Sequence, residues 1–237
     1  MERPYVILSA AVSLDGFLDD DSPERLILSN AEDFDRVDAV RADVDAVAVG
    51  AGTVRADDPR LLVRSAARRA GRVAAGRRES PLRVVFSPSG ELDPGARLFA
   101  GGDPVVVYTS VAGAAVFAVG REAAEPVATG EREVDLEAAL ADLAGRGVSR
   151  LLVEGGGTVH TAFLSADLVD EVHVAVAPFL LGERGRRGSR TRRRSRSRRR
   201  GRCGWWRRGR SGRWRCWCTG ATDRPGCFSS LARFGLI

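Results

Sequence analysis

Short apolar runs that alternate with segments of helical spacing constrain the fold of this chain more than any other feature of its sequence. Strands are expected over residues 5–16, 45–54, 82–87, 104–110, 149–157 and 169–182. Helices are expected from Ser29 or Asn30 to Val44, over 135–147 and over 158–168. The Ala/Arg/Gly-rich stretch 65–80 suggests a surface loop. Strands that alternate with helices favour an α/β fold with a mostly parallel central sheet.

Charge divides the chain into an acidic body and a basic tail. Residues 1–183 contain 18 arginines and 30 acidic residues, a net charge of −12, and the chain has no lysine. Residues 184–237 contain 19 arginines and a single acid, Asp223, a net charge of +18. All four cysteines and all four tryptophans also lie in the tail. We therefore expect one domain over 1–183 and a separate tail over 184–237.

Three strand ends carry glycine or aspartate, and open parallel sheets bind ligands beyond the carboxyl ends of their strands. These ends are Asp15-Gly16, the segment from Gly50 to Asp58, and the segment from Glu154 to Thr158. In the last of them a buried strand runs through three glycines into a helix, which leaves backbone N–H groups at the helix N-terminus for an anion. The alternative is that the glycines only form a tight turn.

Polar side chains accompany two of these strand ends. Thr53, Asp57 and three arginines follow the second, and Arg41 on the preceding helix could face the same cleft. Arginines in a cleft bind phosphate through two parallel hydrogen bonds, although most arginines are solvated surface residues. Glu154 is either an exposed loop acid or a carboxylate that contacts a ligand, because burial without a partner would be costly.

Several classes of site are absent from the sequence. The zinc deaminase pattern, G-x-S-x-G and the phosphate-binding P-loop do not occur, and no cysteine precedes residue 203. We therefore expect no metal site. The two histidines, His160 and His173, are interpreted as structural. The sequence offers few candidate acids and bases, and this scarcity fits a reaction in which a cofactor carries out the difficult step. No apolar run approaches the ~18 residues of a membrane span, and the acidic N-terminus is not a secretory signal, so a cytoplasmic protein is expected.

Three stretches in order resemble the reductase domain of riboflavin biosynthesis, which is the C-terminal half of a bifunctional deaminase/reductase and also occurs alone. They are RPYVILSAAVSLDG, LSNAEDFDRVDAVRADVDAVAVGAGTVRADDPRLLVR and LLVEGGGTVHTAFLSADLVDEVHVAVAPFLLG. The resemblance covers about residues 3–183 and implies a dihydrofolate-reductase-like fold, with helices flanking a mostly parallel sheet. It also implies a homodimer that uses NADPH to reduce the ribosylamino side chain of a small-molecule substrate, a pyrimidine 5′-phosphate, to ribitylamino. The implied enzyme is a stand-alone oxidoreductase similar to 5-amino-6-(5-phosphoribosylamino)uracil reductase.

The resemblance also implies roles for individual residues. The cofactor-binding positions are Ala11, Thr53, Asp57, Ser87, Gly155, Gly156, Gly157 and Thr158, within a matching segment that runs to Ala162. The substrate-binding positions are Arg41, Leu61, Arg64 and Glu154, with both arginines as phosphate clamps. Asp57 is the candidate for handling the proton in catalysis.

Two residues depart from the family pattern on the substrate side. Phe17 replaces a frequent basic residue and Leu26 a frequent tryptophan, so the sequence leaves open whether the pyrimidine carries 2-amino or 2-oxo. Reduction of a dihydrofolate-like pterin, which would not need the phosphate-binding arginines, is the alternative reaction. The alternative outside the enzymes is a non-catalytic protein whose basic tail binds nucleic acid.

The tail has three competing interpretations: an arm that binds nucleic acid, a cysteine-based module, or a frameshift. Arginines interleaved with tryptophans suit charge-plus-stacking contacts to nucleic acid. The cysteine spacing is poor for zinc, and a cytosolic chain should not rely on disulfides.

The genetic code favours a frameshift between about residues 183 and 200. Read from one base earlier, CGWWR and WRCWCT become two apolar, strand-like segments at hairpin distance, because Trp and Cys codons then supply Val and Leu. On this hypothesis the closing strands of the sheet are missing or replaced. The tail is then expected to be disordered and to bind nucleic acid only non-specifically.

Overall fold

The computed structural model describes residues 3–20, 26–101, 104–120 and 122–182, together with the backbone of 204–208 and 214–218. The strands are β1 (Tyr5–Ser13), β2 (Ala46–Gly50), β3 (Leu82–Phe86), β4 (Val105–Thr109), β5 (Ala124–Ala128), β6 (Arg150–Gly155), β7 (Glu171–Ala177), β8 (Gly204–Arg208) and β9 (Trp214–Cys218). The helices are α1 (Ala31–Asp43), α2 (Ala51–Asp57), α3 (Ala66–Ala74), α4 (Val111–Val116), α5 (Leu136–Gly145) and α6 (Gly157–Ser165). A strand lies within each apolar run named above.

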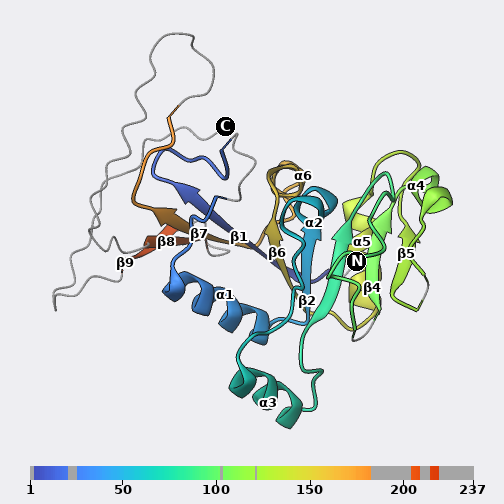
Figure 1. Ribbon diagram of the computed structural model, residues 1–237, viewed down its shortest axis with the longest axis horizontal. Helices are drawn as coiled ribbons and strands as arrows, with labels where there is room; N and C mark the ends of the chain where they lie inside the picture. Colours follow the sequence, from blue (N-terminus) through green and yellow to red (C-terminus); the bar gives the residue numbers. More distant parts are fainter. Residues whose placement is uncertain are drawn as a thin grey trace.

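One sheet in the order β5-β4-β3-β2-β6-β1-β7-β8-β9 organises the molecule (Figure 1). Strands β1 to β7 run parallel, so the carboxyl ends of β1, β2, β3 and β6 lie at the same edge. The chain returns from β5 to place β6 between β1 and β2, which makes these central strands neighbours although they are far apart in sequence. The mostly parallel α/β fold expected from the sequence is confirmed.

Side chains that alternate along the strands pack into two hydrophobic cores, one on each face of the sheet. Val47 and Val49 of β2 pack in the cluster that also holds residues of α2, while Ala46 and Ala48 join residues of α5 and α6. Both faces of β2 are buried, because a parallel sheet covered on each side needs apolar residues at every position.

The expectation of a loop over 65–80 is wrong, because residues 66–74 form α3. Ser65 caps this helix by accepting from the N–H of Arg68 (3.3 Å). The buried Arg72 donates to the carbonyl oxygens of Ala42 and Val44 at 2.8 and 2.9 Å. An arginine that looks like a surface residue in the sequence thus binds carbonyl groups at the end of α1, which holds α3 in place.

The run 45–54 is also shorter as a strand than expected. β2 stops at Gly50, and α2 begins at Ala51 without a side-chain cap that would mark its start in the sequence. α4 and β5 were not anticipated; β5 contains Pro126 and lies at the edge of the sheet, where a missing N–H donor is tolerated.

The closing strands were expected to be missing or replaced, and the backbone of 204–208 and 214–218 fits the second outcome. β8 pairs antiparallel with β7, and β9 pairs antiparallel with β8. These strands overlap the two segments that read as strands in the alternative frame. An open β7 edge offers unpaired N–H and C=O groups, and tryptophan favours strands, so these segments can complete it. The rest of the tail, with its expected disorder, lies outside the described residues, and the frameshift stays a prediction.

No helix in the described part of the chain combines the length and apolar character needed to cross a membrane.

Candidate active site

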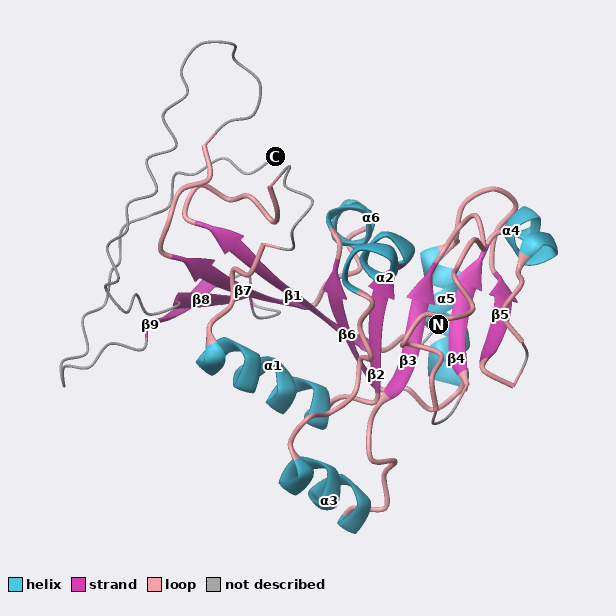
Figure 2. Cartoon of the chain, in the orientation of Figure 1, coloured by secondary structure: helices cyan, strands magenta, loops and turns pink. Residues whose placement is uncertain are grey.

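A cleft of about 760 Å³ opens at the carboxyl edge of the sheet, where the loops after β2, β3 and β6 meet. α2 and α6 lie beyond the ends of β2 and β6 (Figure 2). The assigned residues that line the cleft are Ala11, Thr53, Asp57, Ser87, Glu154, Gly155, Gly156, Gly157 and Thr158. The structure therefore brings together every position that the resemblance matched to a cofactor, along with one substrate position.

Glycines allow the two turns that lead into α2 and α6 to approach each other. A Cβ atom added at Gly50 would lie 2.6 Å from Cγ2 of Val159, and one added at Gly156 would lie 3.0 Å from Oγ1 of Thr53. Gly155 has a φ of +150°, a conformation that L side chains rarely adopt. The peptide bond between Gly155 and Gly156 is cis. Both turns thus depend on glycine for the close packing that forms the floor of the cleft.

The cleft presents groups that suit an anionic, polar ligand. The N-cap of α6 is Gly156, which provides no side-chain cap, and the first turn of this helix has no acidic residue. Its first N–H groups have no intrahelical partner, and the helix dipole favours negative charge there. Ser87 is fully buried at the end of β3, and its Oγ has no hydrogen-bond partner among the described residues.

Glu154 is neither an exposed loop acid nor an unpaired one. Its two carboxylate oxygens accept from Nε and Nη2 of Arg41, both at 2.5 Å, and Nη1 of Arg41 donates to the carbonyl oxygen of Leu62 at 3.2 Å. The two side chains are 12% and 11% exposed. Burial alone would lower the pKa of Arg41, but the hydrogen bonds and charge of Glu154 raise it above its ordinary value. Arg41 therefore stays charged and holds the Glu154 carboxylate in place beside the cleft.

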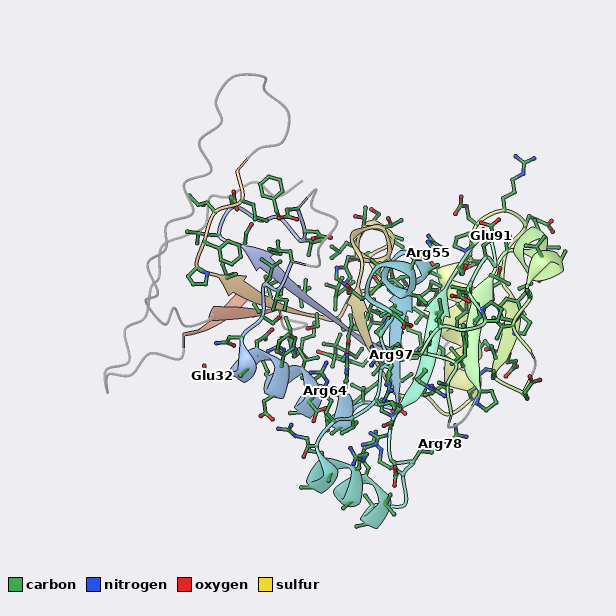
Figure 3. The ribbon with its side chains drawn as sticks, in the orientation of Figure 1. Glu32, Arg55, Arg64, Arg78, Glu91 and Arg97 are labelled. Atoms are coloured by element: carbon green, nitrogen blue, oxygen red, sulfur yellow. The ribbon has the colours of Figure 1, made fainter. Side chains whose placement is uncertain are left out.

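Leu61 and Arg64 lie outside the lining of the large cleft, on the loop between α2 and α3. Leu61 is buried with a φ of +54°. Asp38 fixes the loop by accepting from the backbone N–H groups of Arg64 and Ser65. Although burial opposes it, these donors and Arg68 hold the pKa of Asp38 below its ordinary value. The exposed Arg64, labelled in Figure 3, places its guanidinium 5.5 Å from the ring centre of Phe34.

Phe34 lines a second, smaller cavity of about 170 Å³ that joins the large cleft. Ala11, Asp57, Leu18 and Asp19 line both spaces. Leu26, the residue that replaces a frequent tryptophan, lines the smaller one. The two spaces therefore adjoin each other at Asp57, and the Arg64 guanidinium lies against the Phe34 ring that lines the smaller one.

Residues 4–204 match the family model of the RibD C-terminal domain. This chain belongs to the RibD C-terminal domain family.

Two relatives at about 40% identity are named as reductases. The chain is 41% identical over 183 residues to the 2,5-diamino-6-ribosylamino-4(3H)-pyrimidinone 5′-phosphate reductase of Archaeoglobus fulgidus, covering 77% of this chain and 84% of that protein. It is 40% identical over 186 residues to the protein of that name from Methanothermobacter thermautotrophicus, covering 78% and 82%.

The solved structures agree with this membership. The diaminohydroxyphosphoribosylaminopyrimidine deaminase/5-amino-6-(5-phosphoribosylamino)uracil reductase of Thermotoga maritima superposes with a TM-score of 0.62 at 30% identity. The match covers 76% of this chain and 46% of that one. The resemblance noted in the sequence is thereby confirmed.

The cleft of this RibD C-terminal domain also contains residues to which the resemblance gave no individual role. Glu133 and Val134 reach it from the loop before α5, and so do His160 from α6 and Arg55 from α2, which is labelled in Figure 3. His160 was interpreted as structural, although it lies within the cofactor-matched segment that runs to Ala162. The loop before α5 carries no such signal, because it reaches the cleft only through the fold.

Asp15, at one of the three strand ends considered in the sequence, is not part of the cleft lining. It accepts from the hydroxyl of Ser13 at 2.5 Å and from the N–H groups of Leu181 and Gly182. The Ser13 hydroxyl, aided by those N–H groups, lowers the pKa of Asp15 to about 2. Asp15 thus ties the loop after β1 to the segment after β7. Within the described residues, no group of three or more His, Cys, Asp or Glu side chains is arranged to hold a metal ion.

Proposed function

We propose that this member of the RibD C-terminal domain family is an NADPH-dependent reductase of riboflavin biosynthesis. It converts the ribosylamino side chain of a pyrimidine 5′-phosphate to ribitylamino. The names of its relatives support the reaction. The observation that carries the proposal is the single cleft that holds the cofactor-matched positions together with Glu154.

The residues that would hold the cofactor are Ala11, Thr53, Ser87 and the segment from Gly155 to Thr158. Two observations support the fit: the buried, unpartnered Oγ of Ser87, and the uncapped start of α6 beside it in the cleft. When bound, the reduced nicotinamide supplies the hydride that the sugar carbon receives. The protein's own contribution is to orient both ligands, which can supply up to about 7–11 kcal/mol of the barrier.

On the substrate side, Arg41 and Arg64 have different roles. Because the Arg41 guanidinium already donates three hydrogen bonds to Glu154 and Leu62, it acts as a positioning residue that fixes the Glu154 carboxylate. This replaces the phosphate-clamp role expected for it. Arg64, which is exposed, remains the phosphate-binding arginine. Asp57, which lines both cavities, would pass from solvent the proton that the imine nitrogen takes up when the sugar carbon receives hydride.

The substrate is the 2,5-diamino compound rather than the uracil analogue. The relatives named for the diamino substrate are 40–41% identical and match most of their own length, whereas the bifunctional uracil reductase is 30% identical. Glu154 and Asp57 are acceptors, which suit the amino donors of a diaminopyrimidine. We further propose that the enzyme is a cytoplasmic homodimer, as the resemblance implies; analytical ultracentrifugation of the full chain tests the dimer.

A substrate panel tests the reaction. The full chain should oxidise NADPH with the diaminopyrimidine phosphate, more slowly with the uracil analogue, and not with dihydrofolate. Turnover of dihydrofolate alone would instead support the pterin-type reductase.

A cleft-filling variant tests the location of the site. Gly52 lines the cleft, and nothing lies within 4 Å of where its Cβ would be, so Gly52→Trp should block the reaction without unfolding α2. Gly71 in α3 is equally open and lies outside the cleft lining, so Gly71→Trp is the matched control. Equal activity of the two variants would contradict the assignment of the cleft.

The frameshift remains a proposal about the gene. Resequencing the DNA across codons 180–205 tests it, and an intact frame shared by independent isolates would refute it. As written, residues 184–237 carry a net charge of +18 and are proposed to bind nucleic acid without sequence selectivity, so raised salt should abolish binding.

A further inference from the structure

One arginine in the cleft has no role in the proposed function. Among the described residues that line the cleft, Arg55 is the only one with a permanent positive charge. His160 stays neutral near pH 7, because burial lowers its pKa to about 4. Four carboxylates line the same space: Asp19, Asp57, Glu133 and Glu154. These carboxylates repel a phosphate, so a single cation among them marks a place where an anionic group of a ligand can be bound.

Two observations place the Arg55 side chain at the β3 end of the cleft. Its Nη1 donates to the carbonyl oxygen of Glu91, in the loop after β3, at 3.5 Å, and both residues are labelled in Figure 3. Asp57 lies two positions further along α2, and residues at this spacing do not face each other on a helix. Asp57 lines both cavities, whereas Arg55 lines only the large one. The two charged side chains of α2 therefore face different parts of the cleft.

The order of the strands indicates which end of a dinucleotide lies beside Arg55. The strands that carry the cofactor-matched positions are neighbours in the order β3-β2-β6-β1. In the proposed function the nicotinamide lies beside the substrate, near Asp57 and Glu154, which is the β6 and β1 side. With the pyrophosphate at the start of α6, the adenosine extends toward the loop after β3. NADPH differs from NADH only in the phosphate on the 2′-hydroxyl of this adenosine, and an arginine accommodates that phosphate in other dinucleotide-binding folds.

Arg55 can bind a phosphate while it keeps its contact with the protein. The residue is exposed, and the bond to Glu91 is its one hydrogen bond to the described residues. A guanidinium has five N–H groups, so enough remain for two parallel bonds to a phosphate. Ser89 lines the cleft from the same loop; its Oγ accepts from the N–H of Glu91 at 3.3 Å and can still donate its hydrogen.

We propose that Arg55 binds the 2′-phosphate of NADPH and thereby makes the enzyme prefer NADPH to NADH. This inference rests on the proposed function, and it assigns the choice of dinucleotide to one side chain. NADH has a hydroxyl at that position, so it lacks the ion pair with Arg55 and keeps the other contacts. Arg64 remains the arginine for the phosphate of the substrate, which makes Arg55 a specificity-determining residue for the cofactor alone.

Calorimetric titration of both dinucleotides measures the effect. In the unaltered full chain the Kd for NADPH should be about five- to thirtyfold below that for NADH. Arg55→Leu should raise the Kd for NADPH by about that factor and leave the Kd for NADH within about twofold. The matched control is Arg97→Leu, because Arg97 is also exposed but lies outside the cleft lining (Figure 3). It should leave both constants unchanged, and thermal unfolding checks that both variants fold.

Salt dependence and kinetics separate this phosphate from that of the substrate. Raised ionic strength should weaken NADPH binding more than NADH binding, and this difference should shrink in Arg55→Leu. The KM for the pyrimidine phosphate should be the same in Arg55→Leu and the unaltered protein. Equal Kd values for NADPH and NADH in the unaltered protein, or a preference for NADPH that survives in Arg55→Leu, would overturn the inference and leave the reductase reaction intact. If the unaltered chain binds neither dinucleotide, the proposed function fails as well.

Discussion

The N-termini of α5 and α6 both lie at the cleft but differ in how they are capped. At α5, Asp135 accepts from the N–H of Ala138 at 3.0 Å, and Glu137 adds a negative charge to the first turn. At α6, Gly156 provides no side-chain cap and the first turn has no acid. The helices α1, α3 and α4 are capped like α5, by Asn30, Ser65 and Ser110. The helices α2 and α6 lack a side-chain cap and both begin at the cleft, so each forgoes a contribution that is typically about 1 kcal/mol.

Buried polar atoms follow this division only in part. Away from the cleft, Arg72 and Arg83 donate to backbone carbonyls and His173 has partners on both ring nitrogens. Among the described residues, unsatisfied buried atoms occur both in the cleft lining, at Ser87 and His160, and away from it, at Thr129 and Arg150. Helix capping is therefore the clearer difference, and the variants below test it.

The Arg41–Glu154 pair is the fully satisfied exception in the cleft, and its disruption should have the largest effect. Glu154→Gln leaves a buried guanidinium without its counter-charge, so we expect the free energy of unfolding to fall by about 3 kcal/mol and reductase activity to be lost. The matched control is Glu125→Gln, which removes the partner of Arg146 in an exposed pair. In that variant the free energy of unfolding should fall by less than about 1 kcal/mol, and reductase activity should be retained. Urea titration measures both; equal losses would show that the cleft pair is no more buried in solution.

Acid should destabilise the protein through His160. Its pKa is lowered to about 4 in the folded state, against an unfolded value near 6.5, so between these values the unfolded chain binds a proton that the folded chain does not. Stability is then lost as the pH falls from about 6.5 to about 4, by on the order of 3 kcal/mol. His160→Gln should flatten this part of the curve of unfolding free energy against pH. A slope equal to that of the unaltered protein would mean that His160 titrates normally.

Much of the fold follows from the sequence because its signals are local. Apolar runs of strand length mark β1, β2, β3, β4, β6 and β7, and glycines after Leu143 close α5. α3 was missed because its stability comes from a distant contact: Arg72 reaches the carbonyls at the end of α1, which no local pattern reveals. β8 and β9 lie in segments that were interpreted as strand-like only in the alternative reading frame; as translated, they pair along the edge of β7.

The candidate site was predictable where glycines mark close approaches. Gly50 and Gly156 identify the two turns that meet beneath the cleft. The pairing of Arg41 with Glu154 was not predictable, because 113 residues separate them and only the insertion of β6 beside β2 brings them together. The burial of His160 was not predictable either, because it depends on how α6 packs against the sheet.

Two neighbouring glycines distinguish close packing from open space in the cleft. Gly50→Ala places a methyl group 2.6 Å from Val159 and should reduce the free energy of unfolding by about 1–3 kcal/mol. Gly52→Ala meets nothing within 4 Å and lies inside α2, so it should raise stability by about 0.5–1 kcal/mol. Chemical denaturation measures the sign of the change in unfolding free energy for each variant. Adding Val159→Ala to Gly50→Ala should recover part of the loss; no recovery would show that the strain arises elsewhere.

A charge added at the start of α6 should have the smallest effect on stability. It sharpens the comparison of α5 with α6, because it should stabilise the fold and at the same time weaken NADPH binding. Thr158 is exposed in the first turn of α6, so Thr158→Asp supplies the acid that α5 has and α6 lacks. A negative charge there should stabilise the folded protein by about 0.3–1 kcal/mol through the helix dipole. The same charge should repel a phosphate at the start of α6 and weaken NADPH binding.

The control is Glu137→Gln, which removes the corresponding charge from α5. It should lower stability by about 0.3–1 kcal/mol and leave the Kd for NADPH unchanged. Thermal unfolding and calorimetric titration of NADPH measure the two effects for each variant. If Thr158→Asp raises stability but binds NADPH as tightly as the unaltered protein, the start of α6 is not where the phosphate binds. Its missing cap would then reflect only the close packing of Gly156 against Thr53.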